Sequence, residues 1–153
     1  MSELLPPAPL WRRLCAFGYD LLALLGLWFF ITLIAVALNH GPVGAAIEDG
    51  AVRVHSWPAQ IALYAVLWLA TGIYYTLSWR HGGQTLGMRP WRLRAERDDG
   101  GGIGHRRAWL RYLYAWLGLL PLGAGLFYSL VDRERRALHD LLSGTRLVVL
   151  RKR

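Results

Sequence analysis

Asp20 is the residue with the clearest chemical potential, because its carboxylate lies within an apolar run from Leu14 to Leu38. The run has 25 residues, and a helix needs roughly 20 to cross the hydrocarbon core of a bilayer. An aspartate at the centre of such a helix costs about 2.5–3.5 kcal/mol and is tolerated where it faces other helices, a partner or a watery cavity. Asp20 is therefore the first candidate for a functional ionisable group.

Arg111 is the cation that we expect to pair with Asp20. Arg13 is seven residues before Asp20, on nearly the same helix face but about 10 Å away along the axis, and an arginine at a helix start extends outward to water. Arg111 enters a later apolar block by one turn and can approach from a neighbouring helix. Such a pair would either fix helix register or take part in moving protons or ions, and the sequence leaves both open.

A second polar group, His139 and Asp140, follows Arg133, Arg135 and Arg136. It is either a capped, solvated helix end or a functional group. The five histidines lack metal-ligand spacing, and the chain has no nucleophile-elbow, zinc-protease or phosphate-loop motif. We therefore expect no metal, no cofactor and no enzymatic activity.

The composition is that of an integral membrane protein. Hydrophobic types make up 54% of the 153 residues and are concentrated in long blocks, which predicts burial in a lipid bilayer. The formal charge is +8. Because no nucleic-acid-binding motif accompanies it, we attribute this charge to orientation in the membrane and expect no nucleic-acid partner.

The predicted spans are residues 14–38, 58–79 and 108–131, within one membrane domain of residues 12–150. A flexible lead-in of residues 1–11 precedes the domain and a basic tail of residues 151–153 follows it. Asn39–Pro42 should end the first helix. Trp11, Trp57 and Trp79 are expected at the membrane interfaces.

The positive-inside rule sets the expected topology. Residues 80–107 contain seven arginines and three acids, which places this loop and the N-terminus in the cytoplasm. A single span over residues 108–131 would put the basic tail outside. A helical hairpin bent at Pro121–Gly125 keeps it inside, and we favour that alternative. Such a break is permitted where protein or water satisfies the freed backbone groups.

The fold class is therefore an all-α membrane protein with two full transmembrane helices, a third apolar block and a small cytoplasmic β-hairpin-like element. Residues 91–97 alternate imperfectly, and Asp98–Gly102 is a turn signal. Residues 145–150 are β-prone and are predicted to pair with residues 91–97 if both segments face the cytoplasm.

Three motifs in order give the chain a family resemblance: Arg13–Asp20 in the first span, Gly82–Gly87 after the second, and Arg135–Thr145 near the end. Together they resemble the RDD family of bacterial membrane proteins over about residues 10–150. The family is named for one arginine and two aspartates, which by position would be Arg13, Asp20 and Asp140. Met88 and Pro90-Trp91 depart from the family pattern.

The resemblance implies a plasma (inner) membrane protein of largely unknown role, with cation or proton-coupled transport suggested for some relatives. If Asp140 acts with Arg13, both lie on one membrane face, which again favours the bent third block. We predict that four residues approach one another near the cytoplasmic side: Arg13, Asp20, Arg111 and Asp140. Gln84 and Thr85, which should cap the junction after the second helix, and Arg136 and His139 are the supporting candidates.

Two functions remain open. The first is transport, in which Asp20 binds or relays a cation or proton and a homo-oligomer encloses the pathway. The second is a non-catalytic scaffold or accessory subunit, whose Arg-rich cytoplasmic face contacts a membrane-protein partner or anionic lipid.

Overall fold

The computed structural model describes residues 5–54, 56–119 and 123–151. Its contacts divide the chain into two compact units. Unit 1 comprises Met1–Leu21 and Gly72–Arg153, and unit 2 comprises Leu22–Thr71. The fold is mostly helical, and two helices are long and apolar enough to span a membrane, or up to three spans if a bent pair counts as one. The predicted combination of apolar helices and an antiparallel hairpin is confirmed.

Helices α1 (Leu10–Leu38) and α2 (Trp57–Arg80) are the two candidate spans. α1 ends directly before the Asn39–Pro42 stop, and α2 has Pro58 in its first turn, where the missing N–H has no helical partner to lose. In the most apolar 18-residue stretch of each helix, only 6% of the residues of α1 and 17% of those of α2 are buried. Their exposed apolar surface is what a lipid environment would cover.

Unit 2 holds most of both helices and a hairpin that is not among the predicted elements. Strands β1 (Ala45–Glu48) and β2 (Ala51–Val54) pair antiparallel around Asp49 and Gly50. Both turn residues have positive φ, 52° and 75°, as the type I′ turn favoured by Asp-Gly requires. Within this unit, the indole nitrogen of Trp28 donates to the Thr71 hydroxyl at 2.9 Å, which joins α1 to α2.

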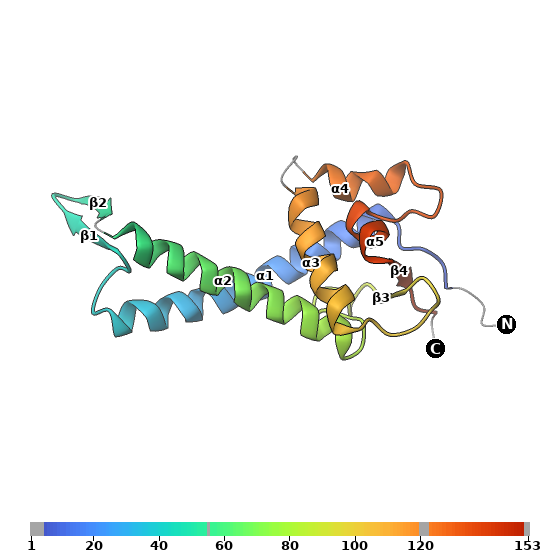
Figure 1. Ribbon diagram of the computed structural model, residues 1–153, viewed down its shortest axis with the longest axis horizontal. Helices are drawn as coiled ribbons and strands as arrows, with labels where there is room; N and C mark the ends of the chain where they lie inside the picture. The colour runs from blue at the N-terminus through green and yellow to red at the C-terminus, as the bar shows by residue number, and fades with distance from the viewer. Residues whose placement is uncertain (1–4, 55, 120–122, 152–153) are drawn as a thin grey trace. The chain divides into compact units, whose positions relative to one another are not determined.

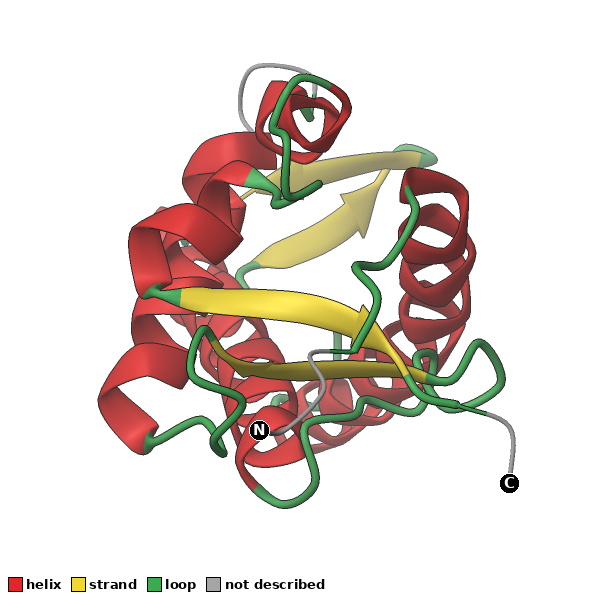
Figure 2. Ribbon diagram, turned by 90° about the vertical axis from the view of Figure 1, so that its right-hand side faces the viewer, coloured by secondary structure: helices red, strands yellow, loops and turns green. Residues whose placement is uncertain are grey.

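Unit 1 carries the other elements: β3 (Leu93–Arg97), α3 (His105–Leu119), α4 (Ala124–Phe127), the 3₁₀ turn η1 (Tyr128–Leu130), α5 (Leu138–Ser143) and β4 (Thr145–Val149). β3 and β4 pair antiparallel from Leu93↔Val149 to Arg97↔Thr145, which confirms the predicted pairing. Figure 1 shows α5 against α3, with β4 continuing from the end of α5. Strands are drawn as yellow arrows in Figure 2, the β3–β4 pair among them.

The N-terminal segment corrects one expectation. Residues 1–11 are predicted to be a flexible lead-in, but the Ala8 amide donates to the Leu147 carbonyl at 2.9 Å and the Val149 amide donates to the Pro6 carbonyl at 2.9 Å. Ala8 is fully buried. The physical reason is that a proline lacks only the N–H, so its carbonyl and its fixed φ still suit the edge of a sheet. Residues 6–8 thus extend the β3–β4 sheet beside β4.

The third apolar block is broken. The axes of α3 and of the α4–η1 segment differ by 108°. The predicted break at Pro121–Gly125 falls partly on residues 120–122, which lie outside the described residues. Gly118 of α3 and Gly125 of α4 pack so closely that a Cβ added to Gly125 would lie 2.6 Å from the Gly118 Cα. These glycines let the two helix backbones meet, as small residues do in membrane proteins.

Candidate functional site

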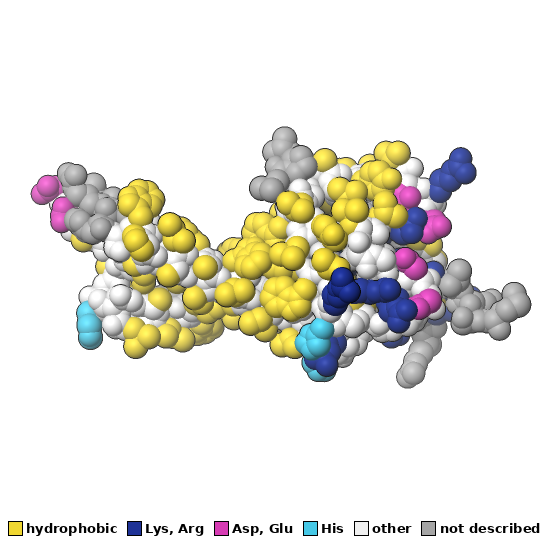
Figure 3. Space-filling model, viewed as in Figure 1, with side chains coloured by type: hydrophobic (Ala, Val, Ile, Leu, Met, Phe, Trp, Pro, Cys, Tyr) yellow, Lys and Arg dark blue, Asp and Glu magenta, His cyan; other side chains and the backbone are white. Residues whose placement is uncertain are grey.

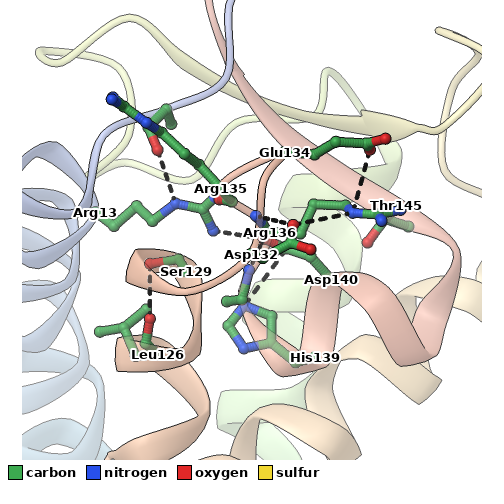
Figure 4. Close-up of polar contacts among 12 residues, drawn as sticks. Arg13, Leu126, Ser129, Asp132, Glu134, Arg135, Arg136, His139, Asp140 and Thr145 are labelled. Carbon is green, nitrogen blue, oxygen red and sulfur yellow. Dashed lines mark hydrogen bonds and ion pairs between the residues drawn. The ribbon is translucent and has the colours of Figure 1, made fainter.

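Asp140 lies at the centre of a buried ionic cluster in unit 1. Its Oδ2 accepts a hydrogen bond from Arg13 at 2.5 Å, and its Oδ1 forms an ion pair with Arg111. Arg13 is 5% exposed, Arg111 1% and Asp140 0%. Figure 4 shows Arg13 reaching toward Asp140. Three of the four residues predicted to approach one another therefore do so.

Local structure positions Asp140. It is the third residue of α5, and its Oδ2 also accepts from the backbone N–H of Ala137 at 3.0 Å, so the carboxylate satisfies an otherwise unpaired donor at the helix start. Gly144 ends α5 in the left-handed conformation, with φ 63°, which glycine adopts without steric cost. α5 is thus a short element that places one carboxylate and then returns the chain into β4.

Arg13 ties three distant segments together. Besides Asp140, its guanidinium donates to the carbonyl of Ala8 at 3.2 Å and to the carbonyl of Arg135 at 2.9 Å. Arg135 has a φ of 53°, a conformation that costs a non-glycine residue about 1–2 kcal/mol. The bond from Arg13 is one contact that holds that carbonyl in place.

Arg111 is enclosed on its other sides by a hydroxyl and a ring. Its Nη1 donates to Thr145 Oγ1 at 2.6 Å, and its Cζ lies 4.9 Å from the Trp79 ring centroid. A guanidinium over an indole face is attracted by the ring's quadrupole. Trp79 is 5% exposed, so its ring packs inside unit 1 beneath this cation and leaves little surface for the predicted contact with lipid headgroups.

The charges in the cluster fix its protonation. Burial alone would raise the pKa of Asp140, but the adjacent Arg111 and Arg13 outweigh it and hold the pKa well below its usual range. The His139 Nε2 lies 3.5 Å from Asp140 Oδ1. Burial lowers the pKa of His139 to about 4 even though Asp140 opposes this. At neutral pH the cluster therefore contains two guanidiniums, one carboxylate and a neutral imidazole.

Asp20 lies in a different polar site, also within unit 1. Its Oδ1 accepts from the Tyr74 hydroxyl at 2.7 Å and from the Gly87 amide at 2.8 Å, and its Oδ2 accepts from the Thr85 hydroxyl at 2.5 Å. The residue is 2% exposed. We call Asp20 and these three donors the Asp20 cradle.

The expected pair of Asp20 with Arg111 is wrong. Arg111 forms its ion pair with Asp140. In the part of the chain that the structure describes, the hydrogen-bond donors to Asp20 are all uncharged. The physical reason is that the loop after α2 returns to α1 and supplies its own donors. A Cβ added to Gly87 would lie 2.8 Å from the Asp20 Cγ, so the loop reaches the carboxylate only because this residue is glycine.

The supporting residues also have other partners than expected. Gln84 donates to the Leu93 carbonyl at 2.8 Å, and Thr85 accepts from the Met88 amide at 3.2 Å besides bonding to Asp20, so their described bonds do not cap α2. The backbone amide of Arg136 donates to Asp132 Oδ2 at 2.9 Å. Asp140 is fully buried, which excludes a solvated helix end.

Four site residues were missed by sequence reasoning. Gly87 ends the second family motif, which does not predict that its amide donates to Asp20. Thr145 ends the third motif and begins a β-prone segment, neither of which predicts its hydrogen bond with Arg111. Trp79 was assigned to the interface, and Tyr74 has no sequence signal beyond being a hydroxyl-bearing residue within a predicted span.

The fold and the buried aspartates define a small, mostly helical protein whose long apolar helices are of membrane-spanning length. The family model of the RDD family matches residues 7–144, so the chain belongs to the RDD family. No curated protein and no solved structure matches the chain. The arginine and the two aspartates of the predicted motif occupy the two polar sites described above.

Proposed function

We propose that the chain is a multi-pass protein of the bacterial plasma (inner) membrane, with a cytoplasmic N-terminus, that takes part in cation or proton-coupled transport. The exposed apolar side chains of α1 and α2 support insertion. The contact of Arg13 with Asp140 supports a topology in which both residues lie on one membrane face. That contact, with the bend between α3 and α4, supports a third block that returns and a cytoplasmic C-terminus.

The observation that carries the transport proposal is the chemistry of the Asp20 cradle. A carboxylate buried in a candidate span is expensive and marks ion or proton pathways. Its hydrogen-bond donors, Tyr74, Thr85 and Gly87, are uncharged, so its charge is not already neutralised by a bonded arginine. A proton or a monovalent cation can supply that neutralisation, and hydroxyl and carboxylate oxygens are suitable ligands for a hard cation.

An ion pathway through the membrane needs more helices around it than one chain provides. Two long helices and one bent pair are too few to enclose a polar route through lipid, so we propose that a homo-oligomer forms it. In this assembly α1 contributes Asp20, and the loop at residues 83–88 adjusts its donors when the carboxylate is neutralised.

Flux measurements test this function. We expect purified protein in liposomes to dissipate an imposed pH gradient when Na⁺ or K⁺ is supplied, and Asp20→Asn to reduce the rate at least tenfold. Asp49→Asn is the matched control, because Asp49 is exposed in the β1–β2 turn and asparagine tolerates its positive φ. Wild-type flux by Asp20→Asn, or no flux by folded wild-type protein, would overturn the proposal.

The second candidate is a non-catalytic scaffold or accessory subunit that binds a membrane-protein partner or anionic lipid. Two observations favour it: the Asp20 cradle is closed to solvent, and basic side chains gather with acidic ones on part of the surface of unit 1 in Figure 3. Intact folding without flux would favour this alternative. Neither proposal includes an enzymatic reaction, a cofactor, a metal centre or nucleic acid.

A further inference from the structure

A pocket of about 350 Å³ opens in unit 1 where α1 begins. Three chain segments line it: residues 11–12, residues 90–92 and residues 149–150. Its volume is within the range of about 300–1,000 Å³ usual for small-molecule sites. None of its seven lining residues is acidic, and two are arginines, Arg12 and Arg92. The pocket therefore favours an anion.

Aromatic rings frame the pocket. The Trp11 and Trp91 rings meet edge to face, with centroids 5.5 Å apart, and the Arg12 guanidinium lies 5.1 Å from the Trp11 ring centroid. Edge-to-face aromatic pairs are favourable and directional. Trp11 and Arg12 stand at the first turn of a candidate membrane span, where tryptophan and arginine meet lipid headgroups.

Two buried donors on the pocket residues lack an acceptor. Among the described residues, neither Arg12 Nε nor Trp91 Nε1 has a hydrogen-bond partner. A buried unsatisfied donor costs about 1–3 kcal/mol, and here two such donors belong to residues that line one basic pocket. Phosphate oxygens are strong acceptors that suit guanidinium groups. The unmet donors are thus an independent indication of an anionic ligand.

The backbone holds Arg92 at the pocket in a strained conformation. Its φ is 55°, its amide donates to the Arg89 carbonyl at 3.1 Å, and its carbonyl accepts from the Leu150 amide at 2.8 Å. Such conformations persist when the surroundings over-determine them and are concentrated at functional sites. The β4 end therefore fixes one basic wall of the pocket.

We propose that this pocket binds the phosphate group of an anionic phospholipid, with Arg12, Arg92 and the Trp91 N–H as its contacts. The inference rests on the proposed membrane insertion of α1. A lipid fits better than free phosphate because part of the lining is apolar, from Pro90, Val149 and Leu150. Leu14 and Phe17 come after the pocket residues Trp11 and Arg12 along α1, and they are 42% and 43% exposed. Their side chains offer an apolar surface for acyl chains.

Native mass spectrometry of the protein in detergent micelles tests the site. We expect dioleoylphosphatidylglycerol to form a saturable adduct, with the Kd raised about tenfold by Arg12→Gln and about threefold by Trp91→Phe, which removes one donor but keeps a ring. Arg106→Gln is the matched control, since Arg106 is exposed on α3 and outside the pocket. It should leave the Kd unchanged.

Three results would overturn the proposal, and each would lead to a different conclusion. Equal lipid affinity for all variants would show that the pocket is not the site. Competition by glycerol 3-phosphate or inorganic phosphate as strong as that by the lipid would show a soluble-phosphate site. If the wild-type protein fails to float with phosphatidylglycerol vesicles after alkaline extraction, membrane insertion itself fails, whereas flotation with unchanged lipid affinity in the variants refutes only this inference.

Discussion

Asp140 and Asp20 are equally hidden from solvent, but their surroundings differ in charge. Asp140 is 0% exposed and is paired with Arg13 and Arg111, whereas Asp20 is 2% exposed and is bonded by a tyrosine, a threonine and a backbone amide. The first site has two cations for one anion. The second has a carboxylate whose bonded neighbours carry no charge. Burial alone therefore does not distinguish the two carboxylates, whereas the charge of their bonded neighbours does.

Removal of the Asp140 carboxylate should have the largest effect. Asp140→Ala leaves two buried guanidiniums without their anion, and breaking a buried pair in this way costs about 3–5 kcal/mol. We expect a corresponding fall in the free energy of unfolding, measured by chemical denaturation in detergent micelles with circular dichroism. Asp132→Asn is the control, since the Asp132–Arg136 pair is more exposed. If Asp140→Ala and Asp132→Asn unfold alike, the cluster does not hold the fold together.

Two threonine substitutions test how much the Asp20 cradle stabilises the protein. Thr85→Val removes a donor to the Asp20 carboxylate and should cost about 1–3 kcal/mol, because a buried acceptor loses its partner. Thr76→Val is the matched control. The Thr76 hydroxyl is equally buried and bonds to the Gly72 carbonyl of its own helix at 2.7 Å. The same denaturation assay should show a clearly larger loss for Thr85→Val, and equal losses would mean that the cradle adds no stability.

Acid pH should produce the smallest effect. Because burial lowers the pKa of His139 to about 4, below the unfolded value of about 6.5, the unfolded state binds more protons between these values. The free energy of unfolding should therefore be at its full value above pH 6.5 and fall as the pH drops toward 4. The His139 side chain is 16% exposed, which reduces the expected loss to about 1–2 kcal/mol.

A substitution at His139 isolates this slope. His139→Gln should flatten the pH dependence between 6.5 and 4, while the exposed His105→Gln should not. Asp140 acts in a separate range, since its depressed pKa contributes stability that is lost only as the pH falls below about 4. A slope that persists in His139→Gln would assign the effect to another group.

The sequence predicts the polar residues better than their partners. Asp20 stands out because a charge interrupts an apolar run, and Arg13 and Asp140 stand out through the family motifs. The partner of Arg111 depends on how α5 packs against α3, a contact between segments that no local pattern encodes. Arg111 therefore pairs with the second aspartate and not with the first.

The secondary-structure elements that the sequence predicts are those with a clear local pattern. Long apolar runs predict α1 and α2, and β-prone residues predict the β3–β4 pair. The β1–β2 hairpin was missed although Asp49-Gly50 is a strong turn signal, because its strands have only four residues each. Pairing of residues 6–8 with β4 was missed because a proline-rich composition resembles that of a linker.

The bonds from Pro6 and Ala8 to β4 have a consequence for biosynthesis. Residues 6–8 leave the ribosome long before their pairing partners Leu147 and Val149, so this sheet edge cannot close until those later residues have been translated. Contacts so distant along the chain form slowly. Arg13 likewise meets Asp140 only after both long helices, α1 and α2, have been translated.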